Sequence, residues 1–353
     1  MKRVIELQKT LAKNTAALVT TDDNRFYLSG MRSSAGTVLV TPENAYLIID
    51  FRYFEKASKT CKFKTVLLEN MKDQLCEFLT KENIKTVLCE TEAVSVDEFG
   101  RFKEMLSPVE LSDSDELSKN LNKLRSIKSE EEISLIKEAQ RLTDDTFSYI
   151  LNFIKAGKTE REIMLEMEFY MRRLGSEGVS FDFIVVSGKN SSLPHGVPTD
   201  KVVENGDFIT MDFGAVVGGY RSDMTRTIAV GHATDEMIKV YDTVLEAQIR
   251  AINGIKAGVT GKEVDALARD YIYGAGYEGY FGHGTGHSVG IFIHENPSCN
   301  PRGTTPLEEN VIMTVEPGIY LPEKFGVRIE DMVVVKQNGC ENITKSEKKL
   351  IVL

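Results

Sequence analysis

The chain has 353 residues, of which 42% are hydrophobic and 27% are charged. That length exceeds the usual size of one hydrophobic core, so we expect two domains, and the composition excludes a disordered chain. The formal net charge of −10 gives no indication of the basic surface that binds nucleic acid or an anionic membrane.

The cysteines indicate a reducing compartment. There are five of them, an odd count with no CxxC spacing, which favours free thiols over a disulfide framework. The first residues, MKRVIELQKT, form an amphipathic pattern rather than an apolar leader, and no apolar run reaches the ~20 residues that span a bilayer. We therefore expect a cytoplasmic protein.

Residues 1–125 alternate short β-rich runs with helical ones, which predicts an α/β domain. The expected strands are 16–19, 36–40, 45–49, 64–68 and 86–89, and the expected helices are 4–12, 71–81 and 94–105. This part contains no histidine, so we expect the chemistry elsewhere. The polar stretch 112–132 has little that could be buried, which predicts a boundary near 125 and two domains, 1–125 and 126–353.

The second domain is predicted to begin with a long helix. Ser129 and Glu132 form a capping box, and apolar residues keep helical spacing from there to a stop at Gly157. A helix over 160–174, a strand over 181–187, a hairpin over 211–227 and two helices between 235 and 274 follow. Residues 311–321 and 327–335 are the clearest later strands. Helices and strands in blocks predict an α+β architecture rather than a doubly wound parallel sheet.

The hairpin brings two aspartates together. Gly218 and Gly219 are the turn signal, because glycine accepts the positive φ of a tight hairpin. Counting outward places Asp212 opposite Thr225, and Asp212 and Asp223 on one face with β-carbons about 7 Å or less apart. Two negative charges at this distance repel each other and require a cation or a shared proton between them. The alternative is a solvated hairpin face with two chance acids.

Further ligand-type residues follow downstream. His283 and His287 are four apart, but three surrounding glycines disfavour a helix, so this is not the HExxH pattern of zinc proteases. Glu316 and Glu330 each interrupt an apolar run, and a buried carboxylate requires a cation, a metal or a proton. For Glu330, the alternative is an outward position that alternates with Arg328.

These residues form a set of four carboxylates and one imidazole: Asp212, Asp223, His287, Glu316 and Glu330. Two divalent cations would balance four negative charges. Oxygen ligands with a single nitrogen suit hard to borderline ions such as Mn²⁺, Co²⁺, Fe²⁺ or Zn²⁺. The set therefore predicts a site for two metal ions, which in proteins lie ~3.5–4 Å apart.

Five segments, in this order and at these separations, resemble the ligand-bearing segments of the pita-bread metallopeptidases of family M24: MDFGA, SDMTRT, GHGTGHSVG, TVEPGIY and GVRIED. LPHG around His195 and IHE around His294 are also similar to that family. The N-terminal domain and SGKNSSLPHGVPTD resemble aminopeptidase P and prolidase, which cleave Xaa-Pro bonds. The resemblance covers essentially the whole chain. It implies a creatinase-like N-terminal α/β domain followed by a pita-bread catalytic domain.

The resemblance also implies residue roles. It implies two metal sites that share ligands: Asp212, Asp223 and Glu330 for the first, and Asp223, Glu330, His287 and Glu316 for the second. It implies that Glu316 is the general base. It implies that His195 and His294 hold the substrate and stabilise the tetrahedral intermediate, and that His283 and Arg328 lie at the substrate pocket. The alternative for Arg328 is that it only orients Glu330.

The implied cofactors are two divalent ions, Mn²⁺ first and Co²⁺, Zn²⁺ or Fe²⁺ as alternatives. The implied substrate is a peptide with proline at its second position, and the implied assembly is a homodimer. Methionine aminopeptidase shares the five ligands but usually lacks such an N-terminal domain. Creatinase shares the fold without a metal, and non-catalytic binding relatives typically have lost ligands. The intact ligand set disfavours both.

Overall fold

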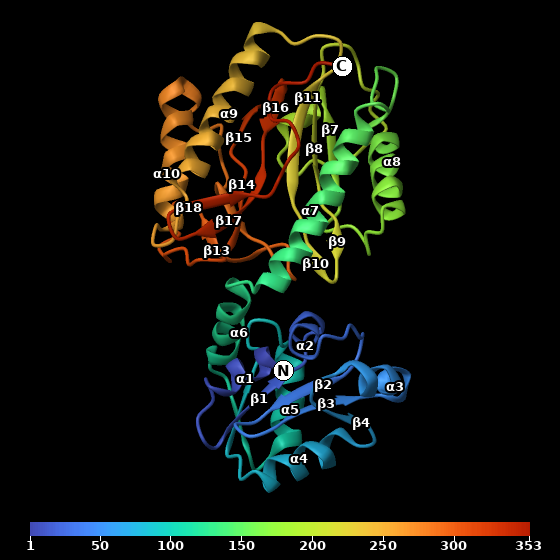
Figure 1. Cartoon of the computed structure of the whole chain (residues 1–353), viewed down its shortest axis with the longest axis vertical. Coiled ribbons are helices and arrows are strands. Elements are labelled where there is room, and N and C mark those ends of the chain that lie inside the picture. The colour runs from blue at the N-terminus through green and yellow to red at the C-terminus, as the bar shows by residue number, and fades with distance from the viewer. The chain divides into compact units, whose positions relative to one another are not determined.

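The computed structural model describes all 353 residues, which divide into two compact units, Met1–Arg125 and Ser126–Leu353 (Figure 1). None of the helices is both long enough and apolar enough to cross a membrane.

The first unit is built on one mixed sheet of six strands in the order β4-β3-β2-β1-β5-β6. The strands are β1 (Thr15–Val19), β2 (Thr37–Val40), β3 (Ala45–Ile49), β4 (Lys64–Leu67), β5 (Thr86–Cys89) and β6 (Glu110–Ser112). The helices are α1 (Lys2–Gln8), α2 (Asp22–Ser29), α3 (Phe51–Thr60), α4 (Met71–Lys81), α5 (Val96–Leu106) and α6 (Glu116–Ser126), which ends at the boundary. Strand β2 pairs antiparallel with both of its neighbours, β1 and β3. The other three pairs, β3 with β4, β1 with β5 and β5 with β6, are parallel. This arrangement confirms the α/β class.

Helices α2, α3 and α6 and strand β6 were not predicted. The expectation that 112–132 contains little to bury was wrong, because Leu117 and Leu121 of α6 are fully buried. They lie four residues apart and share one face of the helix, while charged residues cover its other faces. The many charges concealed a narrow apolar stripe.

The second unit contains two helix pairs and four sheets. The helices are α7 (Glu130–Ile150), α8 (Glu160–Arg173), α9 (Asp235–Gly254) and α10 (Gly261–Ile272), with short helical turns η1 (Gly188–Ser192) and η2 (Tyr273–Tyr277). The first strands are β7 (Ile184–Ser187), β8 (Phe208–Phe213), β9 (Val216–Val217), β10 (Tyr220–Arg221) and β11 (Met224–Ala229). The later strands are β12 (Gly286–Ser288), β13 (Glu295–Cys299), β14 (Ile312–Val315), β15 (Gly318–Leu321), β16 (Phe325–Arg328), β17 (Asp331–Lys336) and β18 (Gly339–Asn342).

Each helix pair covers its own sheet, which confirms the α+β prediction (Figure 1). Helices α7 and α8 pack on the sheet β11-β8-β7 through a core that includes Phe147, Ile163 and Met211. Helices α9 and α10 pack on the sheet β13-β12-β14-β17-β18 through a second core that includes Val244 and Val333. The sheets thus present their other faces to the interior of the unit.

The predicted hairpin is present with the predicted register. Val217 pairs with Tyr220 across the turn, and Asp212 pairs with Thr225 further along. Gly218 and Gly219 adopt φ values of 55° and 79°, which a side chain would disfavour.

Two expected strands are each divided at an acidic residue. The run 311–321 becomes β14 and β15, which lie in different sheets, and the run 327–335 becomes β16 and β17. Pro317 has no N–H group, so the ladder of β14 cannot continue through it. The breaks place Glu316 and Glu330 where the chain passes from one sheet to another. Helix α7 likewise ends at Ile150, before the expected stop at Gly157.

Candidate metal centre

Asp212 lies on β8, and Asp223 lies just before β11 on the other arm of the hairpin. Asp223 is only 4% exposed. One oxygen of Asp212, Oδ2, accepts a hydrogen bond of 2.7 Å from Arg328 Nη2. Its other oxygen, Oδ1, is buried and has no hydrogen-bond partner. The hairpin therefore carries its two acids inward, and the solvated-face alternative is wrong.

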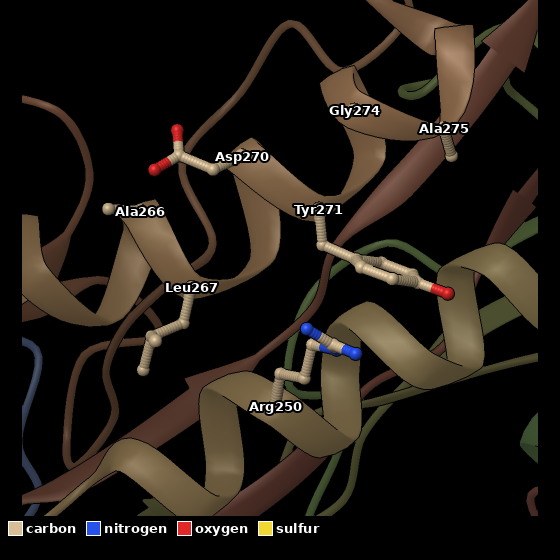
Figure 2. A pocket seen from close by; sticks show the side chains of 7 residues that line it. All are labelled: Arg250, Ala266, Leu267, Asp270, Tyr271, Gly274 and Ala275. Carbon is tan, nitrogen blue, oxygen red and sulfur yellow. The ribbon is translucent and has the colours of Figure 1, made fainter.

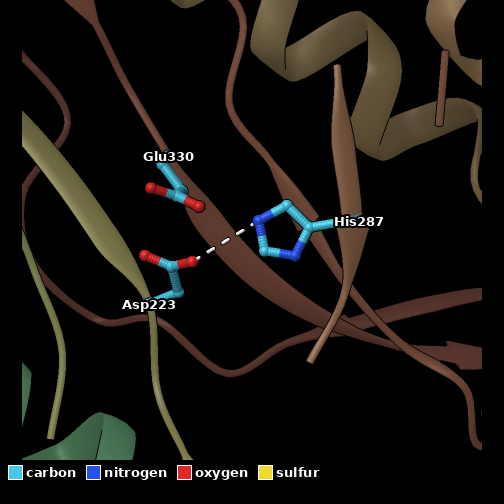
Figure 3. A group of neighbouring side chains, drawn as sticks. All are labelled: Asp223, His287 and Glu330. Carbon is cyan, nitrogen blue, oxygen red and sulfur yellow. Dashed lines mark ion pairs between the residues drawn. The ribbon is translucent and has the colours of Figure 1, made fainter. Parts of the chain in front are cut away.

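His287 lies on β12 and faces the same point (Figure 3). Its Nε2 atom is 3.6 Å from Asp223 Oδ2 and 3.5 Å from Glu316 Oε1. Its Nδ1 atom is 3.1 Å from the carbonyl oxygen of Ser288, which can only accept, so Nδ1 carries the proton of the neutral ring. Burial lowers the pKa of His287 to about 4, with the charge of His294 second. At neutral pH, Nε2 therefore directs a lone pair at two carboxyl groups.

Glu330 completes the inward group. Glu330 is 1% exposed and Arg328 is 3% exposed, so the outward position considered for Glu330 is wrong. Thr225 Oγ1 donates a hydrogen bond of 2.8 Å to Glu330 Oε2, whereas Glu330 Oε1 is buried without a partner. Ligand atoms of Asp223, His287 and Glu330 all lie within 4.8 Å of one another.

The acids of the cluster have raised pKa values, because they lie close together with too little positive charge nearby to balance them. Burial, then the charges of Glu330 and Asp212, raises the pKa of Asp223 well above its usual value. Burial raises the pKa of Glu316 to about 7, although the charge of Arg328 opposes the rise. Burial and the charge of Glu316 raise the pKa of Glu330. The cluster must therefore take up protons or cations at neutral pH.

The residues fit divalent cations. Two carboxylate oxygens are buried without a partner, and one imidazole nitrogen offers a lone pair toward the acids. Unpaired buried acceptors are costly, and cation binding is the usual way in which such a group of oxygen and nitrogen ligands is satisfied.

Arg328 connects the acids to their surroundings. Beside its bond to Asp212, its Nε donates to Thr225 Oγ1 at 3.0 Å, and its Nη1 donates to the Tyr320 hydroxyl at 2.9 Å and to the Pro194 carbonyl at 3.2 Å. Arg328 reaches Glu330 only through Thr225. The sequence reasoning missed Thr225 and Tyr320 as site residues, although the predicted register already placed Thr225 opposite Asp212.

His283 extends this network rather than joining the acids. Its Nδ1 lies 2.8 Å from the Gly284 carbonyl, so Nδ1 donates there, and its Nε2 accepts from the Tyr320 hydroxyl at 2.8 Å. Burial and the charge of Arg328 lower the pKa of His283 to about 4, which keeps this tautomer neutral.

His195 and His294 lie at the edge of the cluster, and both are exposed. The ring of His294 meets that of His287 edge to face, with centroids 4.5 Å apart. Burial and the charge of His195 lower the pKa of His294. His195 follows Pro194, whose carbonyl Arg328 binds. Two accessible imidazoles thus border the buried acids.

A pocket of about 700 Å³ lies elsewhere, between α9 and α10 (Figure 2). Figure 2 shows the guanidinium of Arg250 beside the ring of Tyr271, and the distance from Arg250 Cζ to the ring centroid is 4.2 Å. None of the clustered acids or histidines lines this pocket.

The chain is similar to known proteins over its full length. Residues 134–337 match metallopeptidase family M24, and residues 3–127 match the creatinase/prolidase N-terminal domain. The structure of Xaa-Pro dipeptidase from Bacillus anthracis is 43% identical, with a TM-score of 0.96 and coverage of 100% of this chain and 99% of that one. X-Pro aminopeptidase from Thermotoga maritima is 39% identical, with a TM-score of 0.91 and coverage of 98% and 99%. An Xaa-Pro dipeptidase of Pyrococcus horikoshii is 36% identical over 99% of this chain and 98% of its own length.

Three findings indicate the same family: the two matched segments, the order of the acids and histidines along the chain, and the fold. The chain belongs to metallopeptidase family M24 and carries the N-terminal domain of the creatinase and prolidase group.

Proposed function

We propose that the protein is a metal-dependent exopeptidase that hydrolyses Xaa-Pro bonds at the N-terminus of peptides or in dipeptides. The observation that carries the proposal is the largely buried group of four carboxylates and one neutral imidazole, in which Asp212 Oδ1 and Glu330 Oε1 lack any partner. Relatives that match nearly the whole chain are named Xaa-Pro dipeptidase and X-Pro aminopeptidase, which supports this bond as the substrate.

Two divalent ions would be held by shared ligands. We assign Asp212, Asp223 and Glu330 to one ion, and Asp223, Glu330, His287 and Glu316 to the other. Ions held there would supply a nucleophile at neutral pH by lowering the pKa of water. Mn²⁺ is the proposed ion, with Co²⁺, Zn²⁺ or Fe²⁺ as alternatives, because oxygen ligands with a single imidazole suit hard to borderline cations.

Glu316 is the proposed general base. Its carboxylate belongs to the acid cluster, with Oε1 3.5 Å from His287 Nε2, and the family resemblance supports this role. It would take a proton from the attacking water. The same proton can then pass to the proline nitrogen, which must be protonated before it leaves.

The histidines at the edge of the cluster would bind the substrate. His195 and His294 are accessible, and both can donate a hydrogen bond to the carbonyl oxygen as negative charge develops on it. His283 is assigned to the wall of the substrate pocket. The bonds of Arg328 to Asp212, Thr225, Tyr320 and Pro194 favour a positioning role over direct contact with the substrate.

The Xaa-Pro bond explains why such a site is useful. Its nitrogen carries no hydrogen, so an enzyme that grips an amide N–H cannot use it, and the ring also restricts the preceding residue. A site built on acids, ions and imidazoles does not depend on that hydrogen.

A homodimer and a cytoplasmic location complete the proposal. The family resemblance supports the dimer. The five cysteines, none of which forms a disulfide, support a reducing compartment.

Products from three peptides test the substrate class. Enzyme loaded with Mn²⁺ is incubated with Ala-Pro, Ala-Pro-Ala and Met-Ala, and the products are separated by chromatography. Cleavage of Ala-Pro alone indicates a dipeptidase, and release of alanine from Ala-Pro-Ala indicates an aminopeptidase. Cleavage of Met-Ala alone would favour a methionine aminopeptidase, and a protein that retains no metal in elemental analysis would be a non-catalytic relative.

The variant Glu316→Gln tests the general base. It keeps the shape of the side chain and removes the proton acceptor, so we expect a folded protein with hydrolysis reduced at least 10²-fold. The control Glu308→Gln removes an exposed charge from the same region and should turn over normally. Near-normal turnover by Glu316→Gln would rule out its role.

A further inference from the structure

The segment that carries His195 leaves β7 at Ser187 and reaches the start of α8 at Thr199. Ser187 is the last residue of β7 and pairs with Ile209 of β8. Its far end is attached to the first turn of α8, where Arg161 N donates to the Thr199 carbonyl and Glu160 N donates to the Lys201 carbonyl, each at 3.1 Å. Segment 188–198 is therefore a loop whose two ends lie beside the start of one helix.

The carboxylate of Glu160 lies between those two ends. Its Oε1 accepts from Ser187 N at 2.7 Å, from Ser187 Oγ at 3.0 Å and from Asn190 Nδ2 at 3.1 Å. Its Oε2 accepts from Thr199 N at 3.0 Å and from Thr199 Oγ1 at 2.6 Å. Glu160 has no exposed surface. We refer to Glu160, Ser187, Asn190 and Thr199 as the Glu160 cluster.

The position of Glu160 suits a negative charge. It is the first residue of α8, so its carboxylate lies near the positive end of the helix dipole. Every atom that contacts the carboxylate is a hydrogen-bond donor. An acceptor with two oxygens is therefore required at this point, one for each end of the loop.

The middle of the loop is attached on the side of the metal centre. Ser191 Oγ accepts from Gly326 N at 2.9 Å, and the Pro194 carbonyl accepts from Arg328 Nη1 at 3.2 Å. Arg328 also binds Asp212, one of the acids. His195 is thus held next to the acids by its neighbour Pro194, and the ends of its loop are held by Glu160.

We propose that Glu160 is a positioning residue that holds both ends of segment 188–198 and so directs His195 toward the metal centre. The functional part of this inference rests on the substrate-binding role proposed for His195. Glu160 does not contact the acids itself, so its effect on hydrolysis is exerted through the loop.

The variant Glu160→Gln removes this link with little change in shape. A glutamine has one accepting oxygen and one donating amide group. Whichever way it turns, either Ser187 N or Thr199 N faces another donor. A buried N–H without an acceptor is unfavourable, so one end of the loop is released. The matched control is Glu162→Gln in the same helix turn, whose exposed carboxylate caps Thr159 and pairs with Lys158 but contacts neither end of the loop.

Hydrogen exchange of the holoenzyme followed by mass spectrometry measures the loop directly. In Glu160→Gln we expect exchange in peptides covering 188–198 to accelerate at least tenfold. The metal content of this variant should equal that of the wild type. In Glu162→Gln the exchange of this segment should be unchanged. Unchanged exchange in Glu160→Gln would overturn the proposal. This readout needs no turnover, so it decides the role of the loop even if the wild-type protein does not cleave Xaa-Pro peptides.

Kinetics on Ala-Pro, or on Ala-Pro-Ala if only longer peptides are cleaved, test whether Glu160 acts through His195. We expect Glu160→Gln to lower kcat/KM at least tenfold in the wild-type background and less than twofold in the His195→Ala background. Equal losses in both backgrounds would overturn the proposal, because a general structural defect does not depend on His195. Rapid exchange over the whole second unit would overturn it as well.

Discussion

The acids of the candidate metal centre should make the metal-free protein less stable as the pH rises. Burial raises the pKa of Glu316 from its ordinary value of 4.5 to about 7. Below pH 4.5 the group is protonated in both the folded and the unfolded state. Between pH 4.5 and 7 only the folded state keeps the proton, so unfolding releases it and becomes more favourable with rising pH.

The size of the effect follows from that difference in pKa. One pKa unit corresponds to about 1.4 kcal/mol, so Glu316 alone should lower the free energy of unfolding by about 3 kcal/mol between pH 4.5 and 7. The side chain is 18% exposed, so solvent screens this contribution little. For a domain of 150–250 residues, about 3 kcal/mol corresponds to a fall in Tm of roughly 6–12 °C. The raised pKa values of Asp223 and Glu330 act in the same direction.

Scanning calorimetry between pH 5 and 8 measures the effect. The wild type, Glu316→Gln and the control Glu308→Gln are stripped with a chelator and compared at constant ionic strength. We expect a decline of Tm with pH in the wild type and in the control, and a decline smaller by roughly 6–12 °C in Glu316→Gln. With Mn²⁺ bound the sign should reverse, because cation binding requires deprotonated ligands.

Two results would refute this reasoning. A Tm of the metal-free wild type that rises or stays constant over this pH range would mean that the pKa values of the acids are not raised in the folded protein. An equal decline in the wild type and in Glu316→Gln would mean that Glu316 does not titrate near pH 7.

Three further predictions follow from other contacts. Lys128 Nζ lies 3.0 Å from Glu295 Oε2 in a buried ion pair. Lys128→Met should destabilise the protein by about 3–5 kcal/mol, because it removes the positive charge that balances the buried Glu295 carboxylate. The double variant Lys128→Met/Glu295→Gln should recover much of the Tm in calorimetry. His195→Ala should lower kcat about 10²–10³-fold at unchanged metal content, whereas loss of metal in elemental analysis would identify His195 as a ligand. Chelation should abolish hydrolysis and Mn²⁺ should restore it; full activity after verified removal of metal would contradict a metal-dependent reaction.

Local patterns were enough to predict part of the site. The Gly218 and Gly219 turn sets the register of the hairpin, so the pairing of Asp212 with Thr225 follows from counting residues. Glu316 and Glu330 were recognisable because a carboxylate in an apolar run requires a partner. The exact division of the strands was not predictable, because pairing with different sheets decides it.

The sequence by itself determined the α+β class, the hairpin register and the residue types of the candidate metal centre, because periodicity, turn chemistry and charge are local properties. Only the tertiary structure decided how these residues are held. Arg328 binds Asp212 across 116 positions of the chain, and Glu160 binds Thr199 across 39. No local pattern encodes such pairs, since each partner acquires its place from the packing of a different helix or sheet.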